Sequence, residues 1–227
     1  MVSMTAARTR LIQFQKRTHW SLAPFGYGLA RFRYPERQRS LAIAREVASS
    51  RELLLTPTEA VQLYDAAWSA AVLSGDVAEV GVFRGASARI LSEALPEKTI
   101  HLFDTFEGLP ESGDFVRKGD FAAPYDDVQR YLSGRNVKLY KGWFPRDTGA
   151  EVADARFCFV HLDVDLYEGT FQSLEFFWPR MVSGAMVLTH DHPLIHGVQK
   201  AFADFFKGRH TPVIQLSGNQ AMAVKAE

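Results

Sequence analysis

The sequence has little cysteine and no long apolar run, and each absence excludes a class of protein. Its 227 residues contain one cysteine, Cys158, so no disulfide can form within the chain. A single cysteine is typical of a reducing compartment. No apolar run reaches the ~20 residues that a membrane-spanning helix needs, and the N-terminus lacks the small-residue cleavage pattern of a signal peptide. We therefore expect no membrane span and a cytoplasmic location.

Net charge is also absent, with 26 basic and 26 acidic side chains, but the basic ones gather near the N-terminus. Residues 1–40 hold eight of them against Glu36 alone. A basic arm can indicate nucleic-acid or membrane contact. This segment also carries six aromatic residues and no RNA-binding signature, which favours packing on a partner subunit or on the acidic remainder of the chain. We predict no nucleic-acid partner, and an arm over residues 1–55 that makes oligomer or substrate contacts.

The remainder of the chain, residues 56–227, alternates short apolar runs with amphipathic segments and has the length of one domain. A first helix is expected over 57–74, capped by Thr56 or Thr58. Further helices are predicted at 86–95, 124–133, 168–180 and 196–207. Strands are predicted at 77–82, 99–104, 136–141, 156–163, 184–189, 212–216 and 220–225. Such alternation predicts a mostly parallel sheet with helices on both faces.

The last two predicted strands differ from the others because only Ser217-Gly218-Asn219 separates them. A link this short suits a tight antiparallel hairpin. The predicted fold class is therefore α/β: a Rossmann-like sheet of seven mostly parallel strands with a C-terminal antiparallel hairpin. This plan is usual in class I methyltransferases, whereas a plain dinucleotide-binding sheet continues with parallel strands.

A glycine-bearing turn follows the first predicted strand. Gly81 and Gly85 permit a tight turn and a close approach, but Phe83 stands where a dinucleotide fingerprint has its middle glycine. A bulky side chain there obstructs a pyrophosphate. The turn leads into the helix predicted at 86–95. Gly81, Phe83, Gly85 and Ser87 are therefore predicted to bind a cofactor without phosphate bridges. A turn that binds no ligand is the alternative.

Two further positions suit a nucleoside. Asp104 ends the second predicted strand, where a carboxylate can accept hydrogen bonds from both ribose hydroxyls. The alternative is that Asp104 caps a helix before Phe106. Gly142 and Trp143 follow the third strand, where an adenine could lie against the indole. A lone tryptophan is more often a core residue, so Trp143 supports a cofactor site only together with Asp104.

Acidic and imidazole side chains follow two neighbouring strands. His161, Asp163 and Asp165 alternate at the end of a strongly apolar run, so they would share one face if the strand continued that far. The next strand leads into His190 and Asp191. Clustered carboxylates are costly to bury unless a cation or a proton neutralises them, which predicts a metal site of Asp163, His190 and Asp191. Oxygen ligands suit Mg²⁺, and an imidazole could shift the preference toward Mn²⁺, Fe²⁺ or Zn²⁺.

For methyl transfer to a hydroxyl group, the acceptor oxygen must lose its proton and face the methyl donor. A metal lowers the pKa of the hydroxyl and orients it, and a nearby carboxylate accepts the proton. Asp163 is therefore predicted to be catalytic as well as metal-binding, and Asp165 to be the general base. The alternative for Asp165 is a strand-end aspartate that caps the following helix.

Together these stretches resemble the macrocin O-methyltransferase family (TylF/MycF type) of class I S-adenosylmethionine-dependent methyltransferases. The resemblance covers roughly residues 56–225. Its motifs are Glu79-Val-Gly-Val-Phe-Arg-Gly85, Asp104-Thr-Phe-Glu-Gly-Leu-Pro110, Gly119-Asp-Phe121, Lys141-Gly-Trp-Phe144, His161-Leu-Asp-Val-Asp-Leu-Tyr167, Ser173-Leu-Glu-Phe-Phe-Trp-Pro-Arg180 and Gly218-Asn-Gln-Ala221. It implies methyl transfer from S-adenosylmethionine to a hydroxyl of a small molecule, such as a sugar of an antibiotic, usually with Mg²⁺. It also implies that Glu79, Gly81, Asp104 and Trp143 line the cofactor pocket, and that residues 114–125 form a lid.

The chain departs from the family pattern at the metal site. Where the family has two aspartates followed by a tyrosine, this sequence reads His190-Asp191-His192. The change could retune the metal, weaken its binding or mark a relative that works without one. Two other functions stay open, an NAD-linked Rossmann oxidoreductase and a non-catalytic S-adenosylmethionine-binding relative. The resemblance also implies a homo-oligomer.

Overall fold

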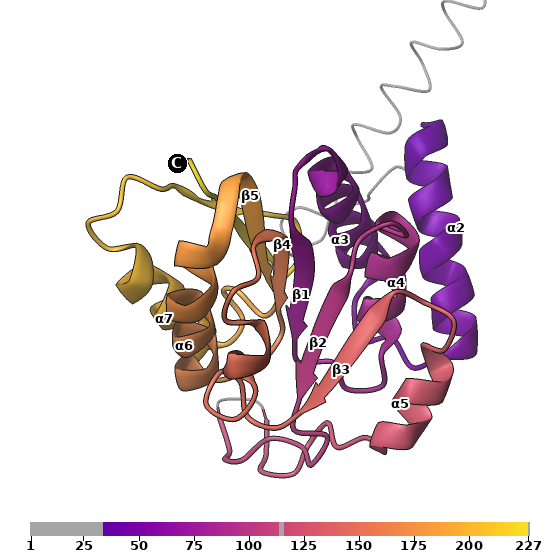
Figure 1. Ribbon diagram of the computed structural model, residues 1–227, viewed down its shortest axis with the longest axis horizontal. Coiled ribbons are helices and arrows are strands. Elements are labelled where there is room, and N and C mark those ends of the chain that lie inside the picture. The colour runs from indigo at the N-terminus through magenta and orange to yellow at the C-terminus, as the bar shows by residue number, and fades with distance from the viewer. Residues whose placement is uncertain (1–33, 114–115, 227) are drawn as a thin grey trace, which may run out of the picture. The chain divides into compact units, whose positions relative to one another are not determined.

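The computed structural model describes residues 34–113 and 116–226. Within these residues, seven strands form one sheet in the order β3-β2-β1-β4-β5-β7-β6 (Figure 1). The strands are β1 (Asp76–Val80), β2 (Ile100–Asp104), β3 (Val137–Lys141), β4 (Phe157–Leu162), β5 (Met181–Thr189), β6 (Val213–Gln215) and β7 (Ala221–Val224). Neighbouring strands are parallel except β7, which is antiparallel to both β5 and β6. The predicted fold class is confirmed.

Helices cover both faces of the sheet (Figure 1). One layer contains α2 (Pro35–Ser50), α3 (Pro57–Ser69), α4 (Ala86–Ala94) and α5 (Tyr125–Tyr131), and the other contains α6 (Tyr167–Phe177) and α7 (His196–Phe206). Side chains of a strand alternate between its faces. Phe159 of β4 accordingly packs in the core with α3 and α4, whereas the next residue, Val160, packs in the core with α6 and α7.

All five predicted helices are shorter in the structure, and two of them, α3 and α6, are followed by a 3₁₀ turn. The helix predicted at 57–74 ends at Ser69 and is followed by η2 (Ala70–Val72). The helix predicted at 168–180 ends at Phe177 and is followed by η4 (Trp178–Arg180). Pro179 lies inside η4, and proline has no backbone N–H with which to continue an α-helix.

The register of the sheet brings the functional motifs to one edge. Glu79 of β1 pairs with His161 of β4, which pairs with Leu188 of β5. Residues two positions later, among them Asp163 and His190, therefore follow the strands at the same C-terminal edge. The chain also reverses its direction of strand addition between β1 and β4. Ligands of open α/β sheets bind at such a switch point.

The predicted N-terminal arm is described only in part. Residues 1–33 lie outside the described residues, as do the predictions that depend on them. The rest of the 1–55 segment includes α2, whose Ala44 and Val47 are buried in the core with residues of α3 and α4. At least the second half of α2 is therefore integrated with the sheet-containing body.

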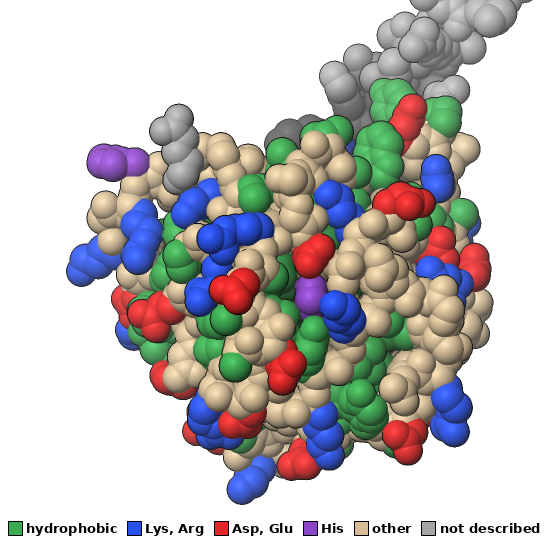
Figure 2. Space-filling model, viewed as in Figure 1, with side chains coloured by type: hydrophobic (Ala, Val, Ile, Leu, Met, Phe, Trp, Pro, Cys, Tyr) green, Lys and Arg blue, Asp and Glu red, His purple; other side chains and the backbone are tan. Residues whose placement is uncertain are grey.

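Two features of the described residues concern membrane contact and surface charge. None of the described helices has the length and apolar character that crossing a bilayer would require. On the face shown in Figure 2, basic and acidic side chains of the described residues are interspersed.

Candidate functional site

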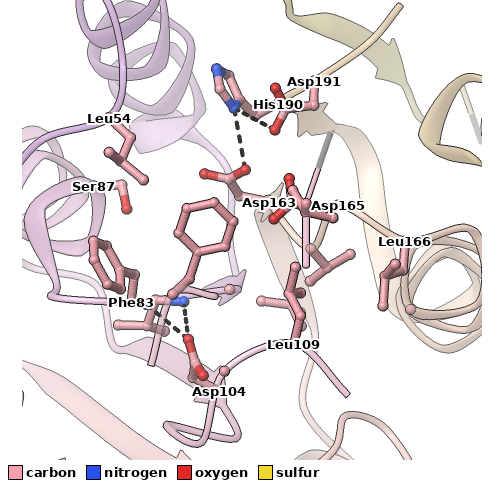
Figure 3. A pocket seen from close by; sticks show the side chains of 18 of the residues that line it. Leu54, Phe83, Ser87, Asp104, Leu109, Asp163, Asp165, Leu166, His190 and Asp191 are labelled. Atoms are coloured by element: carbon pink, nitrogen blue, oxygen red, sulfur yellow. Dashed lines mark hydrogen bonds and ion pairs between the residues drawn. The ribbon is translucent and has the colours of Figure 1, made fainter. Parts of the chain in front are cut away.

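A cavity of about 420 Å³ opens at the C-terminal edge of the sheet (Figure 3). Its volume falls in the range of roughly 300–1,000 Å³ that is usual for small-molecule sites. Most residues predicted to bind cofactor or metal line it: Gly81, Phe83, Ser87, Asp104, Gly142, Trp143, Asp163, Asp165, His190 and Asp191. Asp104 and the group around Asp163 lie at different sides of the pocket (Figure 3). One cavity therefore joins the predicted cofactor end to the predicted chemistry end.

Asp104 shapes the cavity wall through hydrogen bonds to the backbone. Its Oδ2 accepts the N–H groups of Val82 and Phe83, both at 2.8 Å, and its Oδ1 accepts that of Phe106 at 2.7 Å. Burial raises the pKa of this carboxyl, and the hydrogen bonds oppose the rise. Asp104 thus accepts the N–H of Phe106, but no helix begins there, so the helix-capping alternative is wrong. Its contact with a ribose stays a prediction.

The two glycines of the β1–α4 turn are explained by the backbone of the chain itself. Gly81 has a φ of 89°, and a Cβ added to it would lie 1.8 Å from the carbonyl oxygen of Asp163. Gly85 has a φ of 83° and directly precedes α4. A Cβ added to Gly85 would lie 3.2 Å from Cγ1 of Val128. Gly81 lines the cavity but Gly85 does not. A close backbone approach explains Gly81, and the left-handed φ explains Gly85, before any ligand is considered.

Glu79 and His161 form a buried pair behind the cavity wall. Both are 0% exposed, and Nδ1 of His161 lies 2.8 Å from Oε1 of Glu79. Burial raises the pKa of Glu79, and the contact with His161 opposes the rise. Oε2 of Glu79 and Nε2 of His161 have no hydrogen-bond partner among the described residues. Because Glu79 is not on the wall, its direct contact with a cofactor stays a prediction.

Trp143 is held at the cavity wall by both of its N–H groups. Its indole N–H donates to Oε1 of Gln172 at 3.3 Å, and its backbone N–H donates to Oδ2 of Asp147 at 2.9 Å. Gly142, with a φ of 148°, turns the chain out of β3 just before it. The indole therefore has a fixed orientation at the wall, as a stacking surface for an adenine would need.

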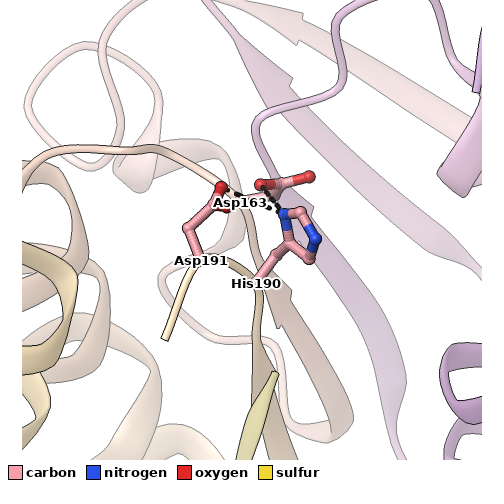
Figure 4. Close-up of side chains that lie close together, drawn as sticks. All are labelled: Asp163, His190 and Asp191. Atoms are coloured by element: carbon pink, nitrogen blue, oxygen red, sulfur yellow. Dashed lines mark hydrogen bonds and ion pairs between the residues drawn. The ribbon is translucent and has the colours of Figure 1, made fainter. Parts of the chain in front are cut away.

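Three ligand-type side chains converge where β4 and β5 end (Figure 4). Nδ1 of His190 lies 3.2 Å from Oδ1 of Asp163 and 3.0 Å from Oδ2 of Asp191. Burial lowers the pKa of His190, but the three carboxylates of Asp163, Asp191 and Glu59 outweigh it and raise this pKa. In return, burial opposes ionisation of Asp163, but His190 lowers its pKa. The structure thus places the predicted ligands together, and metal binding itself stays a prediction.

Asp165 reaches this cluster through a turn and not by strand alternation. β4 ends at Leu162, and the backbone of Asp165 is left-handed with a φ of 59°. The strand therefore does not continue far enough to place His161, Asp163 and Asp165 on one face. Burial, followed by the charges of Asp163 and Asp191, raises the pKa of Asp165 to about 9.

Backbone strain is concentrated around this cavity. Four residues other than glycine on its wall have a left-handed φ, namely Phe83 (48°), Phe121 (63°), Asp165 (59°) and Asp191 (58°). Each such conformation costs on the order of 1–3 kcal/mol and persists only where the surrounding structure imposes it. Strain of this kind clusters at functional sites, so it supports the same cavity independently of the motifs.

The loop between β2 and α5 closes one side of the cavity. Phe121 meets Phe83 edge to face, with the ring centroids 5.8 Å apart. Val116 packs with Ile195 at the start of α7. The described part of the predicted 114–125 lid therefore rests on both the β1–α4 turn and α7. Its action as a lid stays a prediction, and residues 114–115 lie outside the described residues.

Glu59 lies on the cavity wall although it was not predicted as a site residue. It is 2% exposed, and its Oε2 lies 3.6 Å from Nε2 of His190. Burial raises its pKa, but His190, Asn219 and Thr56 outweigh burial and lower it to about 2. In the sequence Glu59 is explained by its place in a capping box with Thr56, so no local pattern indicates the second contact.

The donor set fits a divalent cation. One ligand atom each from Asp163, His190 and Asp191 lies within 4.8 Å of the others. Asp165 adds a third carboxylate, and burial, followed by the negative charges of Asp163 and Asp191, raises its pKa. A cation at the cluster would balance that charge. Which cation the site would prefer stays a prediction, because oxygen ligands suit Mg²⁺ and an imidazole ligand suits Mn²⁺, Fe²⁺ or Zn²⁺.

Curated relatives are methyltransferases by name. The chain is 30% identical over 168 residues to the 8-demethyl-8-(2,3-dimethoxy-alpha-L-rhamnosyl)-tetracenomycin-C 4'-O-methyltransferase of Streptomyces olivaceus, with 63% of each chain covered. It is 27% identical over 139 residues to demethyldecarbamoylnovobiocin O-methyltransferase of Streptomyces niveus, covering 52% of this chain and 53% of the relative. The chain therefore spans less than two thirds of the length of these relatives.

Solved structures agree on the fold, and a family model identifies the chain. The O-methyltransferase NovP superimposes with a TM-score of 0.67 at 18% identity, covering 85% of this chain and all of that one. A calicheamicin methyltransferase gives a TM-score of 0.64 at 20% identity, covering 88% of this chain and 99% of that one. The model of the macrocin O-methyltransferase (TylF) family matches residues 62–217, well over half of the chain. With that match, and with most of the family motifs contributing residues to one cavity, this chain belongs to the macrocin O-methyltransferase (TylF) family.

Proposed function

We propose that this chain is an S-adenosylmethionine-dependent O-methyltransferase. Its acceptor would be a hydroxyl of a small molecule, namely a sugar or a glycosylated natural product, and a divalent cation would assist. The names of both curated relatives support the reaction, and one of them names a rhamnosyl group. The observation that carries the proposal is the placement of Asp163, Asp165, His190 and Asp191 on the wall of the cavity that also contains Asp104.

The two sides of the cavity would have different roles, because one would bind the cofactor and the other would activate the acceptor hydroxyl. S-adenosylmethionine would supply the methyl group from its sulfonium, bound between the β1–α4 turn, Asp104 and Trp143. A cation held by Asp163, His190 and Asp191 would lower the pKa of the acceptor hydroxyl. Asp165 would accept the hydroxyl proton at its carboxylate, which requires it to be ionised. Its raised pKa in the metal-free protein is therefore a physical reason to include a cation.

A second opening offers a path for the acceptor. A groove of about 440 Å³ shares Asp165, Leu166 and Ile195 with the main cavity. Its wall also carries the polar side chains of Glu111, Ser112, Tyr167, His196 and Lys200. Hydroxyl-rich molecules need such hydrogen-bonding partners, and the shared Asp165 would meet the reacting hydroxyl where groove and cavity join.

Binding of S-adenosylhomocysteine, the product of the cofactor, tests the cofactor assignment. At 100 times its Kd, a ligand that binds only the folded state adds about 2.7 kcal/mol of stability. For a chain of this size, this corresponds to a rise in Tm of roughly 5–10 °C. We expect that rise with S-adenosylhomocysteine and none with NADH in the same thermal-shift assay. A rise with NADH alone would instead support the oxidoreductase alternative.

The raised pKa of Asp165 predicts that the stability of the chelator-treated protein depends on pH. In the unfolded chain its pKa is about 3.9, and in the folded protein it is raised to about 9. Between these values only the folded state holds the proton, so the free energy of unfolding falls as pH rises, by at most about 1.4 kcal/mol per pH unit.

We expect Asp165→Asn to flatten this decline between about pH 5 and pH 8, as measured by urea denaturation. Added Mn²⁺ should flatten it in the wild type, because a cation favours the ionised carboxylate. Parallel profiles for the two proteins without metal would show that Asp165 is not the titrating group.

Homo-oligomerisation and a cytoplasmic location are also proposals. The resemblance supports the first, and the single cysteine supports the second. Light scattering on the full chain would measure the oligomeric state.

A further inference from the structure

The carboxylate of Glu59 is fixed at the junction of α3 and the β6–β7 hairpin. Its Oε2 accepts the backbone N–H and the hydroxyl of Thr56 at 2.8 and 2.7 Å. Its Oε1 accepts the backbone N–H of Asn219, at the hairpin tip, at 2.8 Å. A Cβ added to Gly218 would lie 2.5 Å from Oε1, so the hairpin presses directly on this carboxylate. The group is therefore held from the helix side and from the hairpin side.

From this position Glu59 faces Nε2 of His190, the ring nitrogen that does not contact Asp163 or Asp191. Nδ1 of His190 faces Asp163 and Asp191, at 3.2 and 3.0 Å. Nε2 has no hydrogen-bond partner among the described residues, but it lies 3.6 Å from Oε2 of Glu59, within ion-pair distance. The imidazole therefore lies between carboxylates on both sides.

We propose that Glu59 is a positioning residue that fixes the imidazole of His190 from its Nε2 side and so keeps Nδ1 directed at Asp163 and Asp191. Carboxylates that orient a metal-binding histidine through its second nitrogen commonly set the geometry of the site. The inference rests on the proposed function of the cluster. Glu59 precedes residues 62–217, the segment that the family model matches, so the match itself says nothing about this residue.

Glu59→Gln tests the proposal, because glutamine keeps the size of the side chain and one carbonyl acceptor but removes the charge that faces His190. Gln62→Ala is the matched control. Gln62 lies one turn further along α3 and donates to the carbonyl oxygen of Ser217 in the same hairpin at 2.9 Å. Its replacement loosens the same junction without removing a group that faces His190.

Three quantities should be measured on both variants and on the wild type. They are the ¹⁵N chemical shift of Nε2 of His190 in histidine-labelled protein, the affinity for Mn²⁺ by calorimetry, and kcat and KM. In Glu59→Gln we expect a displaced Nε2 resonance and a loss of about 10–100-fold in Mn²⁺ affinity and in kcat. The affinity for S-adenosylhomocysteine should stay within about twofold. Gln62→Ala should match the wild type in all of these.

Two results would overturn the proposal. One is a Glu59→Gln protein whose Nε2 resonance and Mn²⁺ affinity equal those of the wild type. The other is an equal loss in both variants, which would mean that Glu59 only holds the hairpin to the helix. If the wild type transfers no methyl group, the proposed function fails, while the resonance and the Mn²⁺ affinity still decide the role of Glu59.

Discussion

Asp163→Asn is expected to reduce kcat by about 10³-fold, within the range of roughly 10²–10⁴ that loss of a proton-handling or charge-stabilising group costs. Asp163 is the carboxylate at the end of β4 that contacts Nδ1 of His190 at 3.2 Å. Asparagine preserves the shape of the side chain but removes its charge. The cluster then loses a carboxylate ligand, and the acceptor hydroxyl loses the environment that would favour its ionised form.

Cofactor binding should survive this change. Asp104 and the β1–α4 turn lie at a different side of the cavity from Asp163 (Figure 3). The Kd of S-adenosylhomocysteine should therefore remain within a few-fold of the wild-type value. Asp126→Asn, the same substitution at an exposed residue of α5, serves as the control and should leave kcat unchanged. Wild-type turnover in Asp163→Asn would contradict the assignment of the active site.

Gly81→Ala is expected to cost about 3–5 kcal/mol of stability, an exceptional loss for a single methyl group. The added Cβ would lie 1.8 Å from the carbonyl oxygen of Asp163 and 2.7 Å from its carbonyl carbon. Neither contact can be relieved by a side-chain rotation, because both atoms belong to the backbone. The ends of β1 and β4 would have to separate. At roughly 2–4 °C per kcal/mol, Tm should fall by roughly 6–20 °C.

Gly134→Ala separates this steric effect from the conformational cost of a left-handed residue. Gly134 has a similar φ of 78°, and nothing lies within 4 Å of its added Cβ. Its replacement should therefore cost only about 1–2 kcal/mol. Scanning calorimetry of both variants measures the difference. Equal losses would show that the close approach of β1 and β4 at Gly81 is not a strong constraint.

The positions of Asp163, His190 and Asp191 could be predicted because they depend on strand order and on little else. Each follows an apolar strand, and parallel neighbouring strands end at one edge of the sheet. The antiparallel hairpin was equally predictable, since three residues cannot cross over a sheet. Helix ends were less so. Helix α3 ends at Ser69, where the chain tightens into a 3₁₀ turn. The alanines on either side of Ser69 do not indicate this change in the sequence.

Other parts of the site depend on contacts that no local pattern contains. Asp165 leaves the strand through a left-handed turn, whereas the alternation of acidic residues suggested a longer strand. Glu79 carries a family motif, yet the structure pairs it with His161 behind the cavity wall. Glu59 is a capping residue in sequence and meets His190 only because α3 packs beside β5. Tertiary packing sets these three positions.

Product analysis of a methyl-transfer reaction tests the central claim most directly. The chain would be incubated with S-adenosylmethionine, Mn²⁺ or Mg²⁺, and a panel of glycosylated and phenolic acceptors, and the products would be resolved by mass spectrometry. We predict release of S-adenosylhomocysteine, gain of one methyl group on an acceptor hydroxyl, and loss of both when a chelator is added. Tight binding of S-adenosylhomocysteine without transfer to any acceptor, with any divalent ion, would contradict the account and indicate a non-catalytic relative.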